Sequence, residues 1–184
     1  MEKKKHLIFD FDETIATLKI DWSDWHPRIA KIFKEFDPGF LYQGGFIDHL
    51  TVPFIQKYGK KLRDKIVTFE NQYEKEKLKG YIVNNKLVDY IKKNIYQKNY
   101  LITNNMQHTV LPILEEIGIK NRFEKIITFD DVFYCKPHPE GILKIINKNI
   151  PLSDYVVIGD SNNDESVAKS VGIDFIKIVI SQSP

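Results

Sequence analysis

Cysteine is scarce in this sequence, and long apolar runs are missing from it. Cys135 is the only cysteine in 184 residues, so no disulfide can form within the chain. This usage is typical of a reducing compartment, and we expect a cytoplasmic protein. The first apolar run, from His6, is interrupted within a few residues by Asp10 and Asp12. It is too short for a signal peptide or a membrane-spanning helix, so we expect neither, and no membrane partner.

An excess of one charge is also missing. Lysine and arginine together number 27 and the acidic residues 25, which gives a formal net charge of +2. A balance so close to neutral does not favour binding to nucleic acid. Apolar residues make up 42% of the chain, and a chain of this length can form one α/β domain with a modest insertion. The composition gives no indication of oligomeric state.

Short apolar runs alternate with helical patterns over most of the chain. Between the runs, apolar residues recur at helical spacing, and Gly118 and Gly172 mark the ends of helices. Continuous apolar strands that alternate with helices are typical of a parallel sheet covered on both faces. The sequence therefore predicts an α/β fold, a Rossmann-like parallel sheet in a three-layer sandwich. Strands are expected at 6–9, 100–103, 125–129, 155–158 and 175–179, and helices around 87–95, 110–117, 142–146 and 165–171.

The segment 19–80 differs because it shows helical spacing without a strand pattern. Its first helix is expected to end before Pro38-Gly39. A second helix, with an apolar residue at every fourth position from Phe46 to Tyr58, is expected to bend at Pro53. The charged stretch 70–79 of a third helix is interpreted as a solvated face. We therefore predict a core domain formed by residues 1–18 and 81–184, with a small helical domain, residues 19–80, inserted after the first strand.

Acidic and polar side chains follow the predicted strands. Asp10 and Asp12 follow the first strand, Thr103 ends the second, and Asp160 and Asp164 follow the fourth. The carboxyl ends of parallel strands meet at one sheet edge, where open α/β sheets bind ligands. Carboxylates gathered there repel one another unless a hard cation lies among them, and oxygen ligands suit Mg²⁺. A lysine after the third strand adds a positive charge, so the whole set indicates phosphoryl transfer.

Four segments resemble, in order, the four motifs of the haloacid dehalogenase-like superfamily. Residues 10–14, Asp-Phe-Asp-Glu-Thr, resemble Asp-x-Asp-x-Thr after a strand, and residues 101–104, Leu-Ile-Thr-Asn, resemble a strand that ends in Thr or Ser. Residues 136–139, Lys-Pro-His-Pro, are similar to Lys-Pro-x-Pro, and residues 158–164, Ile-Gly-Asp-Ser-Asn-Asn-Asp, to Gly-Asp-x-x-x-Asp. Each motif alone is weak or moderate evidence, but four in order make coincidence remote.

The resemblance implies a phosphatase with two working aspartates. Asp10 would attack phosphorus and form an aspartyl-phosphate, and Asp12 would protonate the leaving oxygen and then activate water. Dehalogenases and phosphonatases of the family lack an acid at the Asp12 position, because halide needs no proton to leave, whereas an alcohol does. We expect hydrolysis of a small phosphate monoester, as in proteins similar to phosphoglycolate phosphatase. The alternatives are a phosphosugar mutase of the same family, similar to β-phosphoglucomutase, and a catalytically idle binding protein on the same fold.

The same resemblance implies a magnesium ion as cofactor. Asp10 and Asp160 would supply carboxylate ligands to Mg²⁺, and the backbone carbonyl of Asp12 would bind it as well. Asp164 would act on the metal through a bound water, or would orient Lys136. Because Mg²⁺ and a lysine reduce the repulsion between a carboxylate and a phosphate, these roles agree with the chemistry of the residues.

Phosphate contacts are implied at three further positions. Thr103, Asn104 and Lys136 would hold the transferring phosphoryl group of a small phosphorylated metabolite. One position departs from the family pattern, because many members have Gly where this chain has Glu13. The departure leaves the class in place and weakens any assignment to a narrow subgroup.

The helical insertion, residues 19–80, resembles the cap domain of the family in its commonest location. Such caps close over small substrates, so we expect the insertion to select the substrate. Arg28 is the first candidate to bind the distal group of the substrate, and Arg63 is the second. Trp25 and His26, which also lie in the insertion, are interpreted as packing residues.

Overall fold

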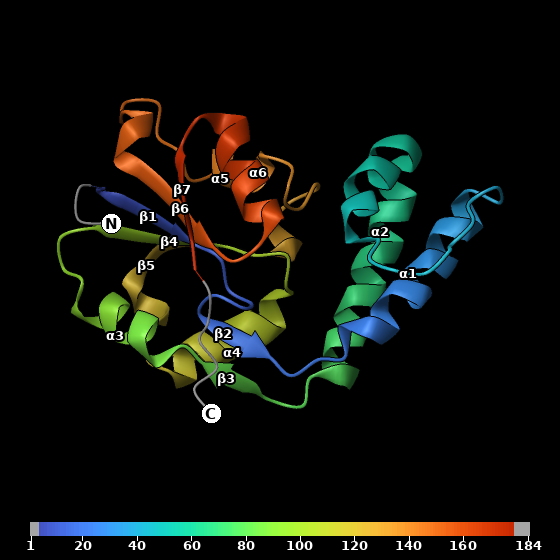
Figure 1. Cartoon of the computed structure of the whole chain (residues 1–184), viewed down its shortest axis with the longest axis horizontal. Coiled ribbons are helices and arrows are strands. Elements are labelled where there is room, and N and C mark those ends of the chain that lie inside the picture. The colour runs from blue at the N-terminus through green and yellow to red at the C-terminus, as the bar shows by residue number, and fades with distance from the viewer. Residues whose placement is uncertain (1–3, 179–184) are drawn as a thin grey trace. The chain divides into compact units, whose positions relative to one another are not determined.

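A five-stranded parallel sheet forms the centre of the computed structural model, which describes residues 4–178 (Figure 1). The strand order is β5-β4-β1-β6-β7, so β1 lies in the middle, and all neighbouring strands are parallel. The predicted fold class is thereby confirmed. Val179, at the end of the last predicted strand, lies outside the described residues. The strands span His6–Phe9 (β1), Lys98–Ile102 (β4), Phe123–Ile127 (β5), Tyr155–Gly159 (β6) and Asp174–Lys177 (β7).

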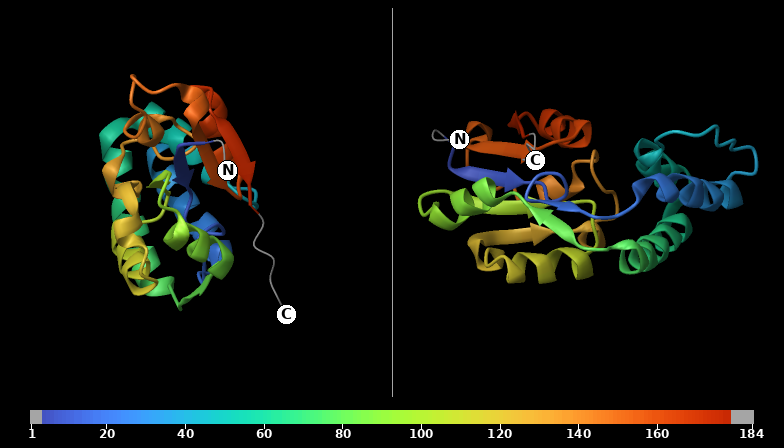
Figure 2. Two further views of the ribbon diagram at one scale, coloured as in Figure 1. Left: turned by 90° about the vertical axis from the view of Figure 1, so that its left-hand side faces the viewer. Right: turned by 60° about the horizontal axis from the view of Figure 1, so that its bottom comes forward.

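Helices cover both faces of the sheet. The chain runs outward from β1 through β4 to β5, and then crosses to β6 and β7 on the other side of β1. Right-handed crossovers place α3 and α4 on one face and α5 and α6 on the other, as Figures 1 and 2 show. Ile8 and Val157 of the sheet accordingly share one buried cluster with Ile142 of α5 and Val167 of α6. The helices span Asn85–Lys93 (α3), Gln107–Glu116 (α4), Glu140–Leu143 (α5) and Asn162–Val171 (α6).

Helix ends follow local sequence signals. Asn84 caps α3 by accepting a hydrogen bond from the N–H of Leu87 at 3.3 Å. Gly172 ends α6 in the left-handed region, with φ of 74°. Two predicted helices are longer than the observed ones: α3 ends before Ile95, which is exposed, and α5 ends before Ile146. Short 3₁₀ turns lie at Asp48–Leu50, Lys120–Arg122, Phe129–Asp131 and Leu152–Asp154.

An antiparallel ribbon of two short strands was not expected from the sequence. β2 (Ala16–Leu18) pairs with β3 (Tyr81–Val83), with Leu18 opposite Tyr81. Strands of three residues are too short to show a reliable period. The ribbon joins the two points at which the chain leaves and re-enters the α/β part.

The residues between these two strands form a separate helical unit. The chain divides into the α/β unit and a compact unit at Lys19–Gly80, which are the bounds predicted for the inserted domain. Its use as a cap stays a prediction. The unit contains α1 (Trp22–Phe36) and α2 (Thr51–Lys77), which pack through rings such as Phe33 and Phe54, whose centroids lie 4.2 Å apart.

Two expectations about the helices of this unit are wrong. The helix expected from Phe46 begins only at Thr51, and Phe46 itself is 79% exposed. Pro53 does not bend the helix, because it lies in the first turn, where its missing N–H breaks no intrahelical bond. The kink is instead at Gly59, whose φ of 70° and ψ of −153° lie outside the helical region. Within residues 4–178, no helix combines the length and the apolar character needed to cross a bilayer.

Candidate active site

The strand register brings the predicted site residues to one edge of the sheet. Phe9, the last residue of β1, pairs with Ile158 near the end of β6, so the two strands finish at the same level. Asp10 extends this pairing, since its N–H donates to the carbonyl of Ile158 at 2.9 Å. Thr103 extends β4 in the same way, through a 3.0 Å bond to β5. The sheet itself therefore fixes the backbone from which Asp10 and Thr103 extend.

Lys136 forms a buried ion pair with two carboxylates at this edge. Its Nζ donates to Oδ1 of Asp10 at 2.5 Å and to Oδ1 of Asp164 at 2.6 Å. Lys136 is only 6% exposed, and Asp164 is fully buried. Burial alone would lower the pKa of Lys136, but the charges of Asp10 and Asp164 outweigh it and raise the pKa. The lysine therefore keeps a positive charge beside Asp10 at neutral pH.

Asp10, Asp160 and Asp164 form an acidic group that could hold a metal ion. Each offers a carboxylate oxygen, and these oxygens lie within 4.8 Å of one another. Burial raises the pKa of Asp10, and Lys136 opposes this shift. Burial and the charge of Asp164 also raise the pKa of Asp160. One lysine does not neutralise three carboxylates, so an oxygen-lined group with excess negative charge fits a hard divalent cation. The side chain of Asp12 is not part of this group.

Asp164 reaches its position because residue 159 is a glycine. A Cβ at Gly159 would lie 2.5 Å from the carboxyl carbon of Asp164, so any larger residue would displace that side chain. The other oxygen of Asp164 accepts hydrogen bonds from the N–H (3.1 Å) and the hydroxyl (2.5 Å) of Ser161. Burial would raise the pKa of Asp164, but Lys136 and Ser161 lower it. Asp164 thus stays ionised, and it both caps α6 and orients Lys136.

Asp12 occupies a different environment, although it lies two residues after Asp10. Its Oδ1 accepts hydrogen bonds from the N–H of Leu18 at 2.8 Å and the N–H of Glu13 at 3.1 Å. Burial raises the pKa of Asp12 to about 7, although the bond from Leu18 opposes the shift. A carboxyl group with a pKa near neutral can both donate and accept a proton, as general acid and base catalysis requires.

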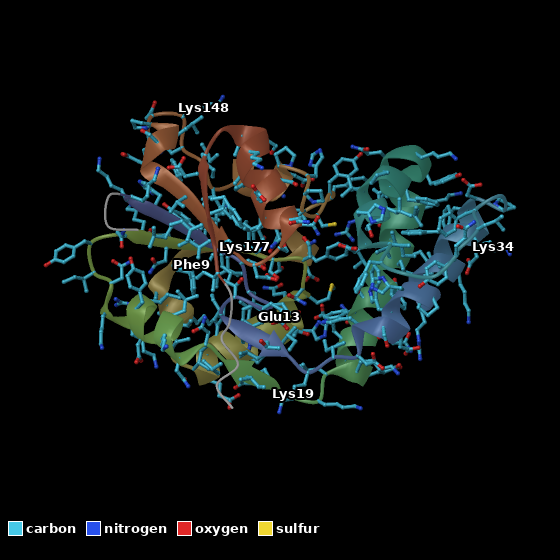
Figure 3. All side chains as sticks on the ribbon, in the orientation of Figure 1. Phe9, Glu13, Lys19, Lys34, Lys148 and Lys177 are labelled. Carbon is cyan, nitrogen blue, oxygen red and sulfur yellow. The ribbon has the colours of Figure 1, made fainter. Side chains whose placement is uncertain are left out.

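Glu13 adopts the backbone conformation that explains the glycine of the family pattern. Its φ is 54°, the left-handed region, where a residue with a Cβ is disfavoured. Its side chain is exposed and accepts a hydrogen bond from the hydroxyl of Thr17 at 3.2 Å. Figure 3 labels Glu13 in the turn beyond Phe9, the end of β1. At the position of the family's glycine, this chain therefore has a residue with a Cβ in the left-handed region.

Thr103, Asn104 and Asn105, which follow β4, form hydrogen bonds through their side chains. The hydroxyl of Thr103 donates to Oδ1 of Asn105 at 2.8 Å and accepts from the N–H of Asn105 at 3.1 Å. The side chain of Asn104 contacts the backbone of Lys136 at both its oxygen and its nitrogen. No sequence motif indicated the bonds of Asn104 and Asn105. Asn104 bonds to Lys136 in another loop, and Asn105 bonds to Thr103 within a local turn. Neither kind of contact has a fixed sequence spacing by which it could be recognised.

The candidate substrate residues of the helical unit have partners inside that unit. Nη2 of Arg28 lies 2.8 Å from Oδ2 of Asp24, and the guanidinium lies 5.7 Å from the centre of the Tyr73 ring. Arg63 is only 4% exposed, and its charge acts on Glu70. The structure therefore leaves Arg28 the more exposed of the two arginines, and a contact of either with substrate stays a prediction.

Two buried acidic residues correct the interpretation of the charged stretch 70–79 as a solvated face. Glu70 is 8% exposed and Glu74 1% exposed. Both carboxylate oxygens of Glu70 accept from Nε1 of Trp25, each at 2.9 Å. The interpretation is wrong for these two residues, because their side chains lie on the buried face of α2 and not on the charged exterior.

Comparison with known proteins identifies the family. The family model described as haloacid dehalogenase-like hydrolase matches residues 7–178. The chain therefore belongs to the haloacid dehalogenase-like hydrolases, as its four motifs predicted.

Individual relatives agree with this assignment. A phosphoglycolate phosphatase of Salmonella paratyphi A is 37% identical over 73 residues, which cover 39% of this chain but only 29% of that protein. The match thus spans less than a third of the relative.

Two solved structures share the fold along nearly the whole chain. A predicted phosphoglycolate phosphatase from Haemophilus somnus has a TM-score of 0.60 at 22% identity, covering 99% of this chain and 92% of that one. A HAD-hydrolase from Bacillus subtilis, solved bound to magnesium, has a TM-score of 0.56 at 18% identity, covering 99% and 90%.

Proposed function

We propose that this protein is a phosphatase that hydrolyses a small phosphate monoester, with Asp10 as the covalent nucleophile. The observation that carries the proposal is the pairing of two unlike carboxyl groups. Asp10 lies in contact with the ammonium of Lys136 at 2.5 Å. Asp12, two residues later, is held by backbone N–H groups and has a pKa near 7. One group is placed to attack and the other to transfer a proton.

Each residue has a defined task in the proposed reaction. A carboxylate oxygen of Asp10 attacks phosphorus, the bond from phosphorus to the leaving oxygen breaks, and Asp12 gives its proton to that oxygen. Water, deprotonated by Asp12, then attacks the aspartyl-phosphate at phosphorus and releases inorganic phosphate. Lys136 reduces the repulsion between the anionic nucleophile and the anionic substrate throughout.

Magnesium is the proposed cofactor at the acidic group. Asp10 and Asp160 would hold the ion with their carboxylates, together with the backbone carbonyl of Asp12, and Asp164 would support the site through Lys136. When bound, the ion would neutralise charge that one lysine leaves uncompensated. The magnesium-bound relative from Bacillus subtilis supports this choice of metal.

The helical unit is proposed to act as a cap that selects the substrate. The groups of the sheet edge act on the phosphoryl group, which all phosphate monoesters share, so discrimination must come from another part of the chain. The unit Lys19–Gly80 is the sizeable remaining element. The similarity to phosphoglycolate phosphatases favours a small, anionic metabolite as the substrate.

The test is release of phosphate from an aryl phosphate and from a panel of small phosphorylated metabolites. We expect turnover with Mg²⁺, none in chelator, and none in Asp10→Asn. Asp89→Asn, an exposed aspartate on α3, is the matched control and should keep full activity. Full activity in chelator or in Asp10→Asn would contradict the mechanism. Transfer of phosphate between sugars with little free phosphate would indicate a mutase instead.

A further inference from the structure

The side chain of Asn104 closes a pair of hydrogen bonds on the backbone of Lys136. Its Oδ1 accepts from the N–H of Lys136 at 2.9 Å, and its Nδ2 donates to the carbonyl of the same residue at 3.1 Å. The side-chain amide thus pairs with the N–H and the carbonyl of one residue, as the backbone of a neighbouring strand does in a sheet. It joins the end of β4 to a loop 32 residues further along the chain.

This pairing uses both functional ends of the amide. An asparagine side chain has one carbonyl and one NH₂ group, and each of them bonds to Lys136. The two bonds therefore join the side chain of Asn104 to both polar groups of the Lys136 backbone. The position of the Lys136 ammonium follows from that backbone, since its Nζ must reach both Asp10 and Asp164.

Other bonds hold the same loop, but at different points. The carboxylate of Glu140 accepts from the N–H groups of Phe133 and Tyr134, each at 2.9 Å. The N–H of His138 donates to the carbonyl of Cys135 at 2.9 Å. These contacts tie the loop to itself and to α5. The Asn104 pair adds a tie to the sheet at Lys136 itself.

We propose that Asn104 is a positioning residue that acts through Lys136 and sets the distance between the lysine ammonium and Asp10. Its effect on turnover rests on the proposed phosphatase function, whereas its effect on Lys136 does not. This role differs from the one expected from the sequence, in which Asn104 contacts the phosphoryl group directly. The two roles make different predictions when Lys136 is removed.

The first experiment follows hydrogen exchange at the Lys136 amide by NMR in the full chain without substrate. Asn104→Ala removes the acceptor of that N–H, so its exchange should become at least about tenfold faster. Asn99→Ala is the matched control. Asn99 is 2% exposed at the opposite end of β4, and its Nδ2 donates to the backbone carbonyl of Arg122 at 3.2 Å. The control should leave exchange at Lys136 unchanged.

The second experiment is a double-mutant cycle on aryl phosphate turnover. We expect Asn104→Ala to lower kcat by about 10- to 100-fold with little change in KM, since a small misplacement of a catalytic group costs this much. In a Lys136→Met background, the same change should cost less than about twofold, because there is no ammonium left to position.

The outcomes distinguish a positioning role of Asn104 from direct binding of substrate, and both from failure of the proposed phosphatase function. Unchanged exchange at Lys136 in Asn104→Ala, or an undiminished loss of kcat in the Lys136→Met background, would overturn the positioning role. A raised KM with unchanged kcat would instead indicate direct binding of substrate. If the wild-type protein turns over no phosphate ester, the proposed function fails, and the exchange experiment alone decides whether Asn104 holds Lys136.

Discussion

Buried charge is treated differently in the two units of this protein. In the α/β unit, Lys136 lies between Asp10 and Asp164 at 2.5 and 2.6 Å, so the buried charges pair directly. In the helical unit, the carboxylate of Glu70 accepts from the indole of Trp25. Burial raises the pKa of Glu70 to about 8, although that bond opposes the shift. Arg63 lowers it less than burial raises it.

The carboxyl groups of Asp10 and Asp164 have a buried cation as their direct partner, whereas the ionised form of Glu70 is destabilised by burial. In the α/β unit, Lys136 opposes the rise that burial causes in the pKa of Asp10 and lowers the pKa of Asp164, so removal of Lys136 would leave two buried carboxyl groups uncompensated. A buried carboxyl group that is held mainly by a neutral donor is more stable when protonated. We therefore expect charge changes at the sheet edge to alter the reaction, and a charge change at Glu70 to alter stability.

After the complete loss of turnover expected for Asp10→Asn, the largest effect is expected for Lys136→Met. The change leaves Asp10 and Asp164 buried without their cation, so turnover of aryl phosphate should fall by about 1,000-fold. The free energy of unfolding should fall by about 3 kcal/mol. Steady-state kinetics and chemical denaturation measure the two effects. Retention of activity within tenfold would show that Lys136 is not part of the machinery.

The next effect is the loss of the proposed acid. Asp12→Asn should slow phosphorylation by alkyl phosphates by about 100-fold, because an alcohol leaves poorly without a proton. Aryl phosphates should lose much less in that step, since an aryl oxide is a good leaving group. Single-turnover rates on both substrates test this, and equal losses would show that Asp12 is not the acid.

In the helical unit, Glu70→Gln should stabilise the protein at alkaline pH. The pKa of Glu70 is higher in the folded state, at about 8, than the ordinary value of 4.5, so the folded state holds an extra proton between these values. Stability from this group is therefore present below pH 4.5 and falls as pH rises toward 8. Glutamine keeps an acceptor for Trp25, and at pH 9 the variant should gain on the order of 3 kcal/mol.

Denaturation of both proteins from pH 5 to pH 9 measures this difference. Glu76→Gln is the control, because Glu76 is exposed on the same helix. It should change the free energy of unfolding by less than about 0.5 kcal/mol at each pH. A constant difference between Glu70→Gln and wild type across the range would mean that Glu70 does not titrate as described.

The smallest effect is expected for Arg28→Ala. A contact with the distal group of the substrate should lower kcat/KM for the best metabolite of the panel by about tenfold, while aryl phosphate turnover is spared. Lys77→Ala is the matched control, since Lys77 is the other partner of Asp24, at 3.0 Å. If both variants respond alike, Arg28 serves the local ion pair and the selecting residues lie elsewhere.

The sheet edge could be predicted because topology converts sequence order into proximity. Asp10, Thr103 and Asp160 each follow a strand, and parallel strands bring their carboxyl ends together. The bonds of Asn104 to Lys136 could not be predicted in this way. An asparagine after a strand has the same appearance in sequence whether it caps a helix, binds a ligand or holds a distant loop.

The helical unit was less predictable for a related reason. The apolar periodicity indicated helices. Phe46, however, fits the helical spacing and still lies outside α2. Glu70 falls within a charged stretch, and composition alone does not show which members of such a stretch face inward. Its hydrogen-bond donor, Trp25, lies 45 residues earlier in the chain. Long-range packing of this kind has no signal in local sequence.

The most direct test of the central claim is to locate the covalent intermediate. Asp12→Asn lacks the base that hydrolyses the aspartyl-phosphate, so the intermediate should accumulate with an aryl phosphate. Acid quench followed by borohydride reduction converts a phosphorylated aspartate to homoserine, which peptide mass spectrometry can place. We predict homoserine at position 10 in samples with substrate and none without it. If the wild-type protein releases phosphate but the trapping experiment shows no modification of Asp10, the account is contradicted. Modification of a different residue would contradict it as well.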